Sequence, residues 1–190
     1  MNASFWLMVG IVGGAPLLAA CGEDGECVTD RYPAAPDGVS ERVHVSAGCP
    51  AEDADGSAAH PYPTIQQGVD HGASGAAVLV SPGTYRENVA ITKPVFVVGS
   101  SSPEDAGAAA IIVQAPAPYA ITTTAEGVTL RGLRVASPQA VGIWVQRGSA
   151  TIEGSAIEGA RPDGEGQYGL GVLAMGGADI TVRTSTVVGS

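Results

Sequence analysis

The chain is poor in positive charge, in aromatic side chains and in cysteine. Its 190 residues include 9 Lys and Arg against 19 Asp and Glu, which gives a net charge of −10. Nucleic-acid binding requires basic patches that displace counterions, so this balance argues against a nucleic-acid partner. Nine of the acidic residues fall between Glu23 and Asp55, and we interpret this cluster as a solvated leader.

Long amphipathic helical patterns are also missing, whereas turn-forming residues are abundant. The chain has 27 Gly and 13 Pro, and only 5% of its residues are aromatic. No helical period separates the short β-rich segments, which argues against alternating strands and helices and leaves a β-sandwich or a solenoid. These segments are residues 77–80, 89–91, 95–98, 110–113 and 128–130.

The N-terminus carries an apolar run, Phe5 to Leu18, that is shorter than a bilayer-spanning helix needs. The sequence Leu18-Ala19-Ala20-Cys21 that ends it resembles the lipobox of bacterial lipoproteins, although no Lys or Arg precedes the run. The resemblance implies that residues 1–20 are a signal peptide and that Cys21 is lipidated. The protein is then extracytoplasmic and held by lipid at the bacterial envelope, at the outer membrane or cell surface. An ordinary secretory signal is the alternative.

If Cys21 carries lipid, Cys27 and Cys49 remain as an even pair. In an oxidising compartment such a pair indicates a disulfide, which would contribute roughly 3 kcal/mol in the chain-entropy model. A metal site is the weaker interpretation, because the three histidines show no ligand spacing. The Asp53 to Ser57 loop has a D-x-D-G spacing but no downstream bidentate Glu, so we interpret it as a polar turn rather than a calcium loop.

Residues 21–42 are acidic and aperiodic, which predicts a flexible tether, and order is expected to begin at Val43. A short helix follows within residues 61–72. Thr64 and Gln67 form a capping box, Ile65 and Val69 share one face, and Gly72 is a plausible C′ residue. A helix of this kind can cover the open end of a solenoid.

An internal repeat distinguishes a solenoid from a sandwich. Residues 128–135 align with 150–157 and with 180–187, at spacings of 22 and then 30 residues, with the extra length in the Gly-rich stretch 161–166. Inward positions form apolar columns, and Arg131, Glu153 and Arg183 form an outward column of alternating charge. Insertions confined to turns between equivalent strands are typical of solenoids. The sequence therefore predicts stacked parallel strands from about residue 76 onward.

Two segments, Pro61 to Asp70 and Val78 to Val89, resemble the entry to the first coils of the pectin-lyase-like superfamily. The resemblance extends over roughly residues 43–190. It implies an all-β fold, a right-handed single-stranded parallel β-helix with a short N-terminal capping helix, but it does not imply an activity. The last repeat stops before the third strand of its coil, so we expect the chain to be a C-terminally truncated fragment of a longer β-helix.

Catalytic groups do not emerge from the aligned columns. Glycosidases need paired carboxylates, whereas Glu153 lies between two arginines and Asp163 and Glu165 belong to a long polar turn. The segment Gly83 to Glu87 matches an element of pectin methylesterases, and Gln139 resembles their oxyanion-stabilising glutamine. The elements that bear their catalytic aspartates are missing. We therefore interpret Gln139 as a turn residue, and Tyr85 and Glu87 as packing and ion-pairing groups, and we expect no cofactor.

Binding needs fewer groups than catalysis. Trp144 alternates with Ile143 and Val145 and so is predicted to face outward, where it could stack on a sugar, although a turn could equally cover it. Arg131, Arg134 and Arg183 could bind an acidic polysaccharide from the adjacent face. We expect an envelope protein that interacts with polysaccharide without catalysis. A polysaccharide-active enzyme whose catalytic coils are missing from the chain, or a structural spacer, are the alternatives.

Overall fold

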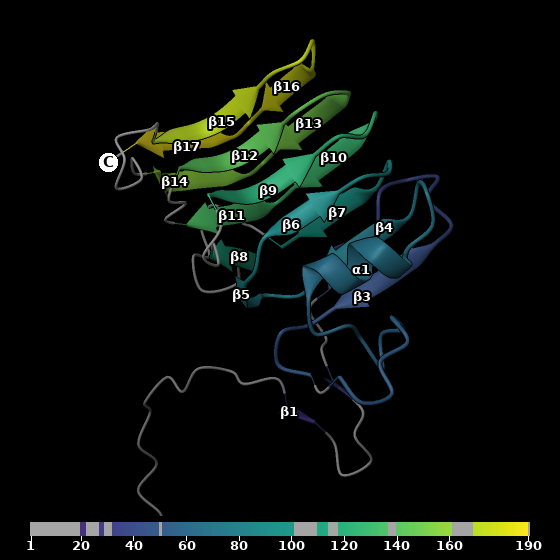
Figure 1. Cartoon of the computed structure of the whole chain (residues 1–190). Coiled ribbons are helices and arrows are strands. Elements are labelled where there is room, and N and C mark those ends of the chain that lie inside the picture. Colours follow the sequence, from purple (N-terminus) through teal and green to yellow (C-terminus); the bar gives the residue numbers. More distant parts are fainter. Residues whose placement is uncertain are drawn as a thin grey trace, which may run out of the picture.

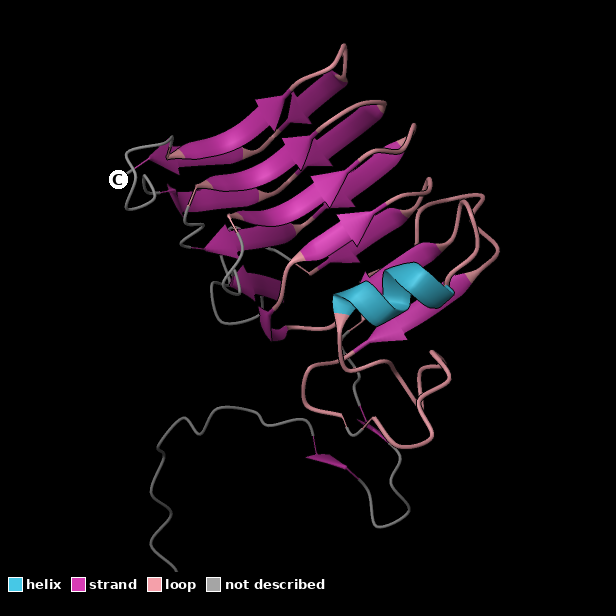
Figure 2. Cartoon of the chain, viewed as in Figure 1, coloured by secondary structure: helices cyan, strands magenta, loops and turns pink. Residues whose placement is uncertain are grey.

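A computed structural model describes residues 32–49, 51–100, 110–113, 118–136, 140–160 and 169–189, together with the backbone of two short strands near the N-terminus. These are β1 (Ala20–Cys21) and β2 (Cys27–Val28), which pair antiparallel. The remaining strands pair in parallel and build three sheets beside a single described helix, as Figures 1 and 2 show.

A six-stranded sheet has the order β16-β13-β10-β7-β4-β3, and a five-stranded sheet has the order β17-β14-β11-β8-β5. The third sheet is four-stranded, with the order β15-β12-β9-β6. The strands of the six-stranded sheet are β3 (Arg42–Val45), β4 (Ala77–Val80), β7 (Phe96–Gly99), β10 (Val128–Arg131), β13 (Ser149–Glu153) and β16 (Asp179–Arg183). Those of the five-stranded sheet are β5 (Gly83–Arg86), β8 (Ala110–Val113), β11 (Leu133–Ala136), β14 (Ala156–Ala160) and β17 (Thr186–Gly189). Those of the four-stranded sheet are β6 (Val89–Ile91), β9 (Tyr119–Thr123), β12 (Val141–Val145) and β15 (Leu170–Ala174).

From β4 onward the chain visits the three sheets in a fixed rotation, and we call one visit to each sheet a circuit. Every third strand therefore lies beside its predecessor, and the repeat found in the sequence is confirmed as strand register. Val128 pairs with Ala150 and Ala150 with Ile180, while Val135 pairs with Ile157. The outward column Arg131, Glu153, Arg183 is also in register.

The core lies between the three sheets. Leu130, Ile152 and Ile157 are fully buried there, as are the inward residues of the earlier circuits. Apolar area removed from water contributes roughly 25 cal/mol per Å². Alternate residues of each strand supply that area, which explains the alternating burial along β10 and β13.

The helix α1 (Ile65–His71) covers the side of the core where the circuits begin. Thr64 is the N-cap, and its hydroxyl accepts from the Gln67 backbone N–H at 3.2 Å, as the capping box predicts. Ile65 and Val69 are buried in the core, again as predicted. Gly72 is the C-cap rather than the C′ residue and has a negative φ of −64°, so it is not needed for a left-handed conformation. Space is the reason for glycine there, because an added Cβ would lie 3.1 Å from the Gly68 carbonyl oxygen.

Two sequence-based expectations require correction. The predicted tether extended to residue 42, but Tyr32, Ala35 and Val39 pack against Leu79 and Val98 on the outer face of the six-stranded sheet, so packed structure begins earlier. The segment Gly83 to Arg86 was not among the expected strand segments, but it forms β5 and pairs with β8. Both segments lack apolar alternation, which explains why their ordered state was not apparent from the sequence.

The last circuit differs from the earlier ones in exposure. Val182 and Val187 are 46% and 48% exposed, whereas their register partners Ile152 and Ile157 are fully buried. Apolar side chains that face the core elsewhere in the stack therefore meet solvent at this end. Within the described residues, no helix is long and apolar enough to span a membrane.

Candidate functional site

The outer face of the four-stranded sheet carries an aromatic pair. On β12, Ile143 and Val145 point into the core, so the intervening Trp144 faces outward and is only partly buried, as the alternation predicts. Tyr119, at the start of β9, lies against it with ring centroids 4.4 Å apart and the ring planes tilted by 41°. Offset, tilted aromatic pairs of this kind are favourable beyond their buried area.

The neighbours of Trp144 in the sheet are short or aliphatic. Thr122 on β9 and Leu173 on β15 flank it in register, and Ala90 continues the same row on β6. The Nε1 atom of Trp144 is covered and has no hydrogen-bond partner among the described residues. The part of Trp144 that solvent reaches therefore excludes its N–H, and the accessible surface is suited to stacking rather than to hydrogen bonding.

Tyr119 is fixed by the preceding circuit. The Asn88 side-chain amide, in the turn between β5 and β6, donates a hydrogen bond to the Tyr119 backbone carbonyl. Tyr119 was not singled out in the sequence, because it belongs to a different circuit from Trp144 and pairs in register with Val141, three residues before Trp144.

The three arginines do not join this aromatic pair. Arg131 and Arg183 lie in the six-stranded sheet, and Arg134 lies in the five-stranded sheet. The structure therefore distributes the predicted ligand-binding residues over three faces. The expectation that the three arginines share one face adjacent to that of Trp144 is wrong, because Arg134 lies in a different sheet from Arg131 and Arg183.

Each arginine has its own surroundings. Arg134 forms an ion pair with Glu158, with its Nη2 and Nε atoms 2.7 Å and 3.1 Å from Oε2, and both side chains are partly exposed. Arg131 donates from Nη2 to the Ala34 carbonyl oxygen at 3.4 Å. Glu153, between Arg131 and Arg183 in register, makes no ion pair with either of them in the described structure. The residues of the predicted charge column are therefore aligned in register, but Glu153 forms no ion pairs along it in the described structure.

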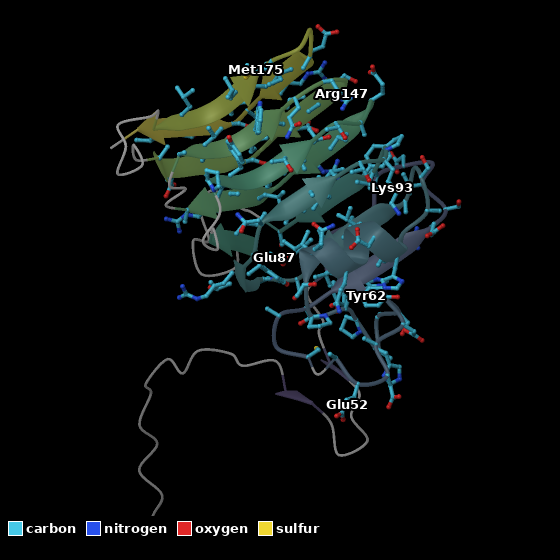
Figure 3. The ribbon with its side chains drawn as sticks, in the orientation of Figure 1. Glu52, Tyr62, Glu87, Lys93, Arg147 and Met175 are labelled. Atoms are coloured by element: carbon cyan, nitrogen blue, oxygen red, sulfur yellow. The ribbon has the colours of Figure 1, made fainter. Side chains whose placement is uncertain are left out.

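An exposed arginine missed in the sequence, Arg147, lies in the turn after β12, close along the chain to Trp144. Figure 3 labels it on the same side of the molecule as Lys93, in the turn after β6. Lys93 donates from Nζ to the Asp70 carbonyl oxygen at 2.8 Å, whereas no ion pair of Arg147 is formed within the described residues. Arg147 is therefore an exposed cation that follows Trp144 by three residues in the chain.

Tyr85 and Glu87 have structural roles. Tyr85 is buried, and its hydroxyl donates to the Ser81 carbonyl oxygen at 2.9 Å while it accepts from the Ala47 N–H at 3.3 Å. Burial raises the pKa of Tyr85 to about 12. Tyr85 is thus a packing group, as interpreted from the sequence.

Glu87, labelled in Figure 3, is not the ion-pairing group that we expected. Its two carboxylate oxygens accept from the backbone N–H groups of Ile65 and Gln66, at 2.7 Å and 2.9 Å, in the first turn of α1. Burial raises the pKa of Glu87, and the two hydrogen bonds oppose that shift. The unpaired N–H groups of a helix start explain this contact.

The remaining predicted groups are placed as follows. Asp55 accepts from the Ser57 N–H at 2.8 Å, which is the polar turn expected of this loop, and hydrogen bonds from Ser57, side-chain first and backbone second, lower its pKa. No cluster of metal-ligating side chains occurs in the described ranges.

Cys49 is buried and disulfide-bonded, while the side chains of Cys21 and Cys27 lie outside the described part of the chain. Gln139, Asp163 and Glu165 also lie outside it.

Comparison with family models, curated proteins and solved structures finds no significant match to this chain. Its function is therefore inferred from the arrangement of its own residues.

Proposed function

We propose that this protein is a right-handed parallel β-helix that is lipid-anchored at Cys21, lies outside the cytoplasm, and binds polysaccharide without catalysis. The observation that carries the proposal is the outward pair of Tyr119 and Trp144 on the four-stranded sheet. Aromatic rings stack on the apolar faces of sugar rings, and the flat surface of a parallel sheet can follow an extended polymer. The threonine hydroxyl beside Trp144 can donate and accept hydrogen bonds.

Several features support the lipid anchor and the β-helix. The lipobox-like sequence ends at Cys21, and a disulfide at Cys49 suits an oxidising compartment. The three parallel sheets, visited in rotation, have the connectivity that a single-stranded β-helix requires. The resemblance of residues 61–70 and 78–89 to pectin-lyase-like proteins favours the right-handed form and a polysaccharide partner.

Intrinsic tryptophan fluorescence can test the proposal, because the chain has only two tryptophans and Trp6 lies in the N-terminal apolar run. Titration with neutral and acidic polysaccharides should change the emission of Trp144. Trp144→Ala and Tyr119→Ala should weaken binding about tenfold each, since central aromatic residues typically contribute more than 1 kcal/mol to an interface. Affinity electrophoresis measures the two variants on the same scale.

Phe96→Leu is the matched control, because Phe96 is an aromatic residue of the six-stranded sheet and lies away from the pair. It should bind as the wild type does. Equal binding by all four proteins would exclude the Tyr119–Trp144 pair as the site. Release of reducing ends, unsaturated uronides or methanol from the bound polysaccharide would show that the protein is an enzyme instead.

A further inference from the structure

A strap, residues 32–39, lies on the outer face of the six-stranded sheet. Its apolar side chains pack against outward side chains of β4 and β7, namely Tyr32, Ala35 and Val39 against Leu79 and Val98. The Arg131 guanidinium adds a hydrogen bond to the Ala34 carbonyl oxygen at 3.4 Å. The strap is therefore held to the sheet near both of its ends.

Between these held parts the strap makes a tight turn. The Val39 N–H donates to the Pro36 carbonyl oxygen at 3.3 Å, and Asp37 and Gly38 are the two central residues. Both are exposed, Gly38 has a φ of 80°, and a Cβ added to it would meet nothing within 4 Å. Among the described residues, neither the Asp37 carboxylate nor the Gly38 N–H has a hydrogen-bond partner. These two groups can therefore approach each other.

An aspartate followed by glycine can rearrange without an enzyme or a cofactor. The glycine backbone nitrogen attacks the Cγ atom of the protonated aspartyl carboxyl, loses its proton and expels water, which closes a succinimide ring. Water then adds to one of the two ring carbonyl carbons. Opening at Cγ restores aspartate, whereas opening at the former main-chain carbon gives isoaspartate, in which the chain runs through Cβ and Cγ. The water lost in the first step returns in the second, so no oxidant or reductant is required.

A second Asp-Gly pair, Asp55 and Gly56, is held apart by other contacts. Asp55 Oδ1 accepts from the Ser57 N–H at 2.8 Å, and the Gly56 N–H donates to the His60 carbonyl oxygen at 2.9 Å. Gly56 is also buried, and a Cβ added to it would lie 2.7 Å from Tyr62 Cε2. Both reacting groups are thus occupied. A third pair, residues 163–164, lies outside the described residues.

We propose that Asp37–Gly38 is a modification site, at which aspartate converts to isoaspartate in the folded protein and thereby detaches the strap from the sheet. The conversion breaks no hydrogen bond of the reacting groups within the described structure, so the fold does not oppose it. Isoaspartate adds one atom to the main chain between Ala35 and Val39. Because both side chains already lie against the sheet, the longer connection shifts one contact relative to the other.

Peptide mapping of the full chain after storage at neutral pH in heavy-oxygen water tests the site. Passage through the succinimide introduces a heavy oxygen atom, and electron-transfer fragmentation distinguishes isoaspartate from aspartate. Isoaspartate should form at Asp37 at least about tenfold faster than at Asp55, since two hydrogen bonds must break first at the latter. In concentrated urea, where the fold is lost, the two pairs should react at similar rates.

Elastase cleavage after Val39 tests the detachment. Stored wild type should be cleaved faster than fresh wild type, and the cleaved fraction should be the fraction that carries isoaspartate. Asp37→Glu is the matched control, because it keeps the charge but would have to close a larger ring, so storage should not change its cleavage. Equal rates at Asp37 and Asp55 in the folded protein would overturn the proposal. A difference that persisted in urea would also do so, because local sequence would then set the rate. Cleavage that is independent of isoaspartate would overturn the detachment.

Discussion

Glu87 holds the first turn of α1 through both carboxylate oxygens, although burial raises its pKa. A carboxyl whose pKa is higher in the folded state binds protons more readily there than in the unfolded chain. Its protonation therefore stabilises the fold below the unfolded pKa of 4.5, and this contribution is lost as the pH rises through the folded pKa.

We expect the free energy of unfolding of Glu87→Gln to rise relative to the wild type as the pH increases from about 4 to 7. The amide has no charge to desolvate, although it leaves one helix N–H without an acceptor. Urea unfolding across this range measures the difference. Glu126→Gln, an exposed change, should show a difference that varies less with pH. Parallel profiles for Glu87→Gln and the wild type would contradict the expectation.

Thr184 has a left-handed backbone conformation that is unusual for a β-branched residue. It has a φ of 45°, and its register equivalents in the two preceding circuits are Gly132 and Gly154, with φ of 64° and 54°. A β-branched residue in this left-handed region is strained, at a cost of order 1 kcal/mol.

Thr184→Gly should therefore raise the free energy of unfolding by about 1 kcal/mol, partly offset by the greater backbone entropy of glycine when unfolded. Thermal unfolding measures the change. Thr129→Gly, inside a regular strand, is the control and should be destabilising. If Thr184→Gly were less stable than the wild type, the turn would gain more from the threonine side chain than it loses in strain.

At the residue scale, the sequence predicted the direction of Trp144 but not its contacts. Alternation along one strand is visible in a sequence, whereas the neighbour Tyr119 belongs to another circuit. The pair of Arg134 and Glu158 was missed for a related reason. Alignment reports direct register partners, and Arg134 pairs with Ala156, so its ion pair with Glu158 is diagonal.

At the scale of elements, α1 fits against the strands because residue 68 has no side chain. A Cβ added at Gly68 would lie 2.5 Å from Val45 Cγ2 and 2.8 Å from Val78 Cγ1. Valine side chains have few alternative rotamers, so these methyl groups cannot easily move aside. The helix would have to move away from β3 and β4.

Gly68→Ala should lower the free energy of unfolding by about 1–3 kcal/mol, the usual cost of overpacking, although alanine favours helix by about 1 kcal/mol over glycine. Chemical denaturation measures this. Gly83→Ala is the matched control, because its Cβ would meet Ala47 at 3.6 Å, an ordinary contact. A Gly68→Ala protein as stable as the wild type would mean that the helix can move at no cost.

Among the elements, those with periodic apolar residues were predicted and the others were not. The strands of the last three circuits share inward columns, so self-alignment of the sequence located them and their register. The strand β5 and the packed segment after Tyr32 have no such pattern. Contacts with distant strands order them, and a local pattern cannot report such contacts.

At the scale of the whole molecule, the proposed lipidation of Cys21 would determine where the protein is held. We expect metabolic labelling with palmitate to mark the wild type and not Cys21→Ser. A lipid chain contributes about 0.8 kcal/mol per buried CH₂, so the label should also distribute to membranes. Ser46→Ala, a change outside the leader, should be labelled as the wild type is. Equal labelling of wild type and Cys21→Ser would exclude lipidation at this position.

The same variant tests the disulfide partner of Cys49. If Cys27 is that partner, Cys21→Ser should show no free thiol after alkylation without reductant, and mass spectrometry should find the Cys27 and Cys49 peptides linked. Loss of the bond in Cys27→Ser should destabilise the protein by about 2–4 kcal/mol. Alkylation of Cys49 in Cys21→Ser would assign the bond to Cys21.

The connections between β14 and its neighbours have an engineering consequence. The Leu133 N–H donates to the Ser155 hydroxyl oxygen across 22 residues, and the Ser155 N–H to the Ser185 hydroxyl oxygen across 30. The same serine contact is thus kept in both steps, although the circuit from β13 to β15 is longer than the circuit from β10 to β12. The added residues between β14 and β15 therefore do not alter how the strands stack. A foreign peptide inserted between Ala160 and Leu170 should leave the core in place, which would make the molecule a scaffold for displaying a guest loop.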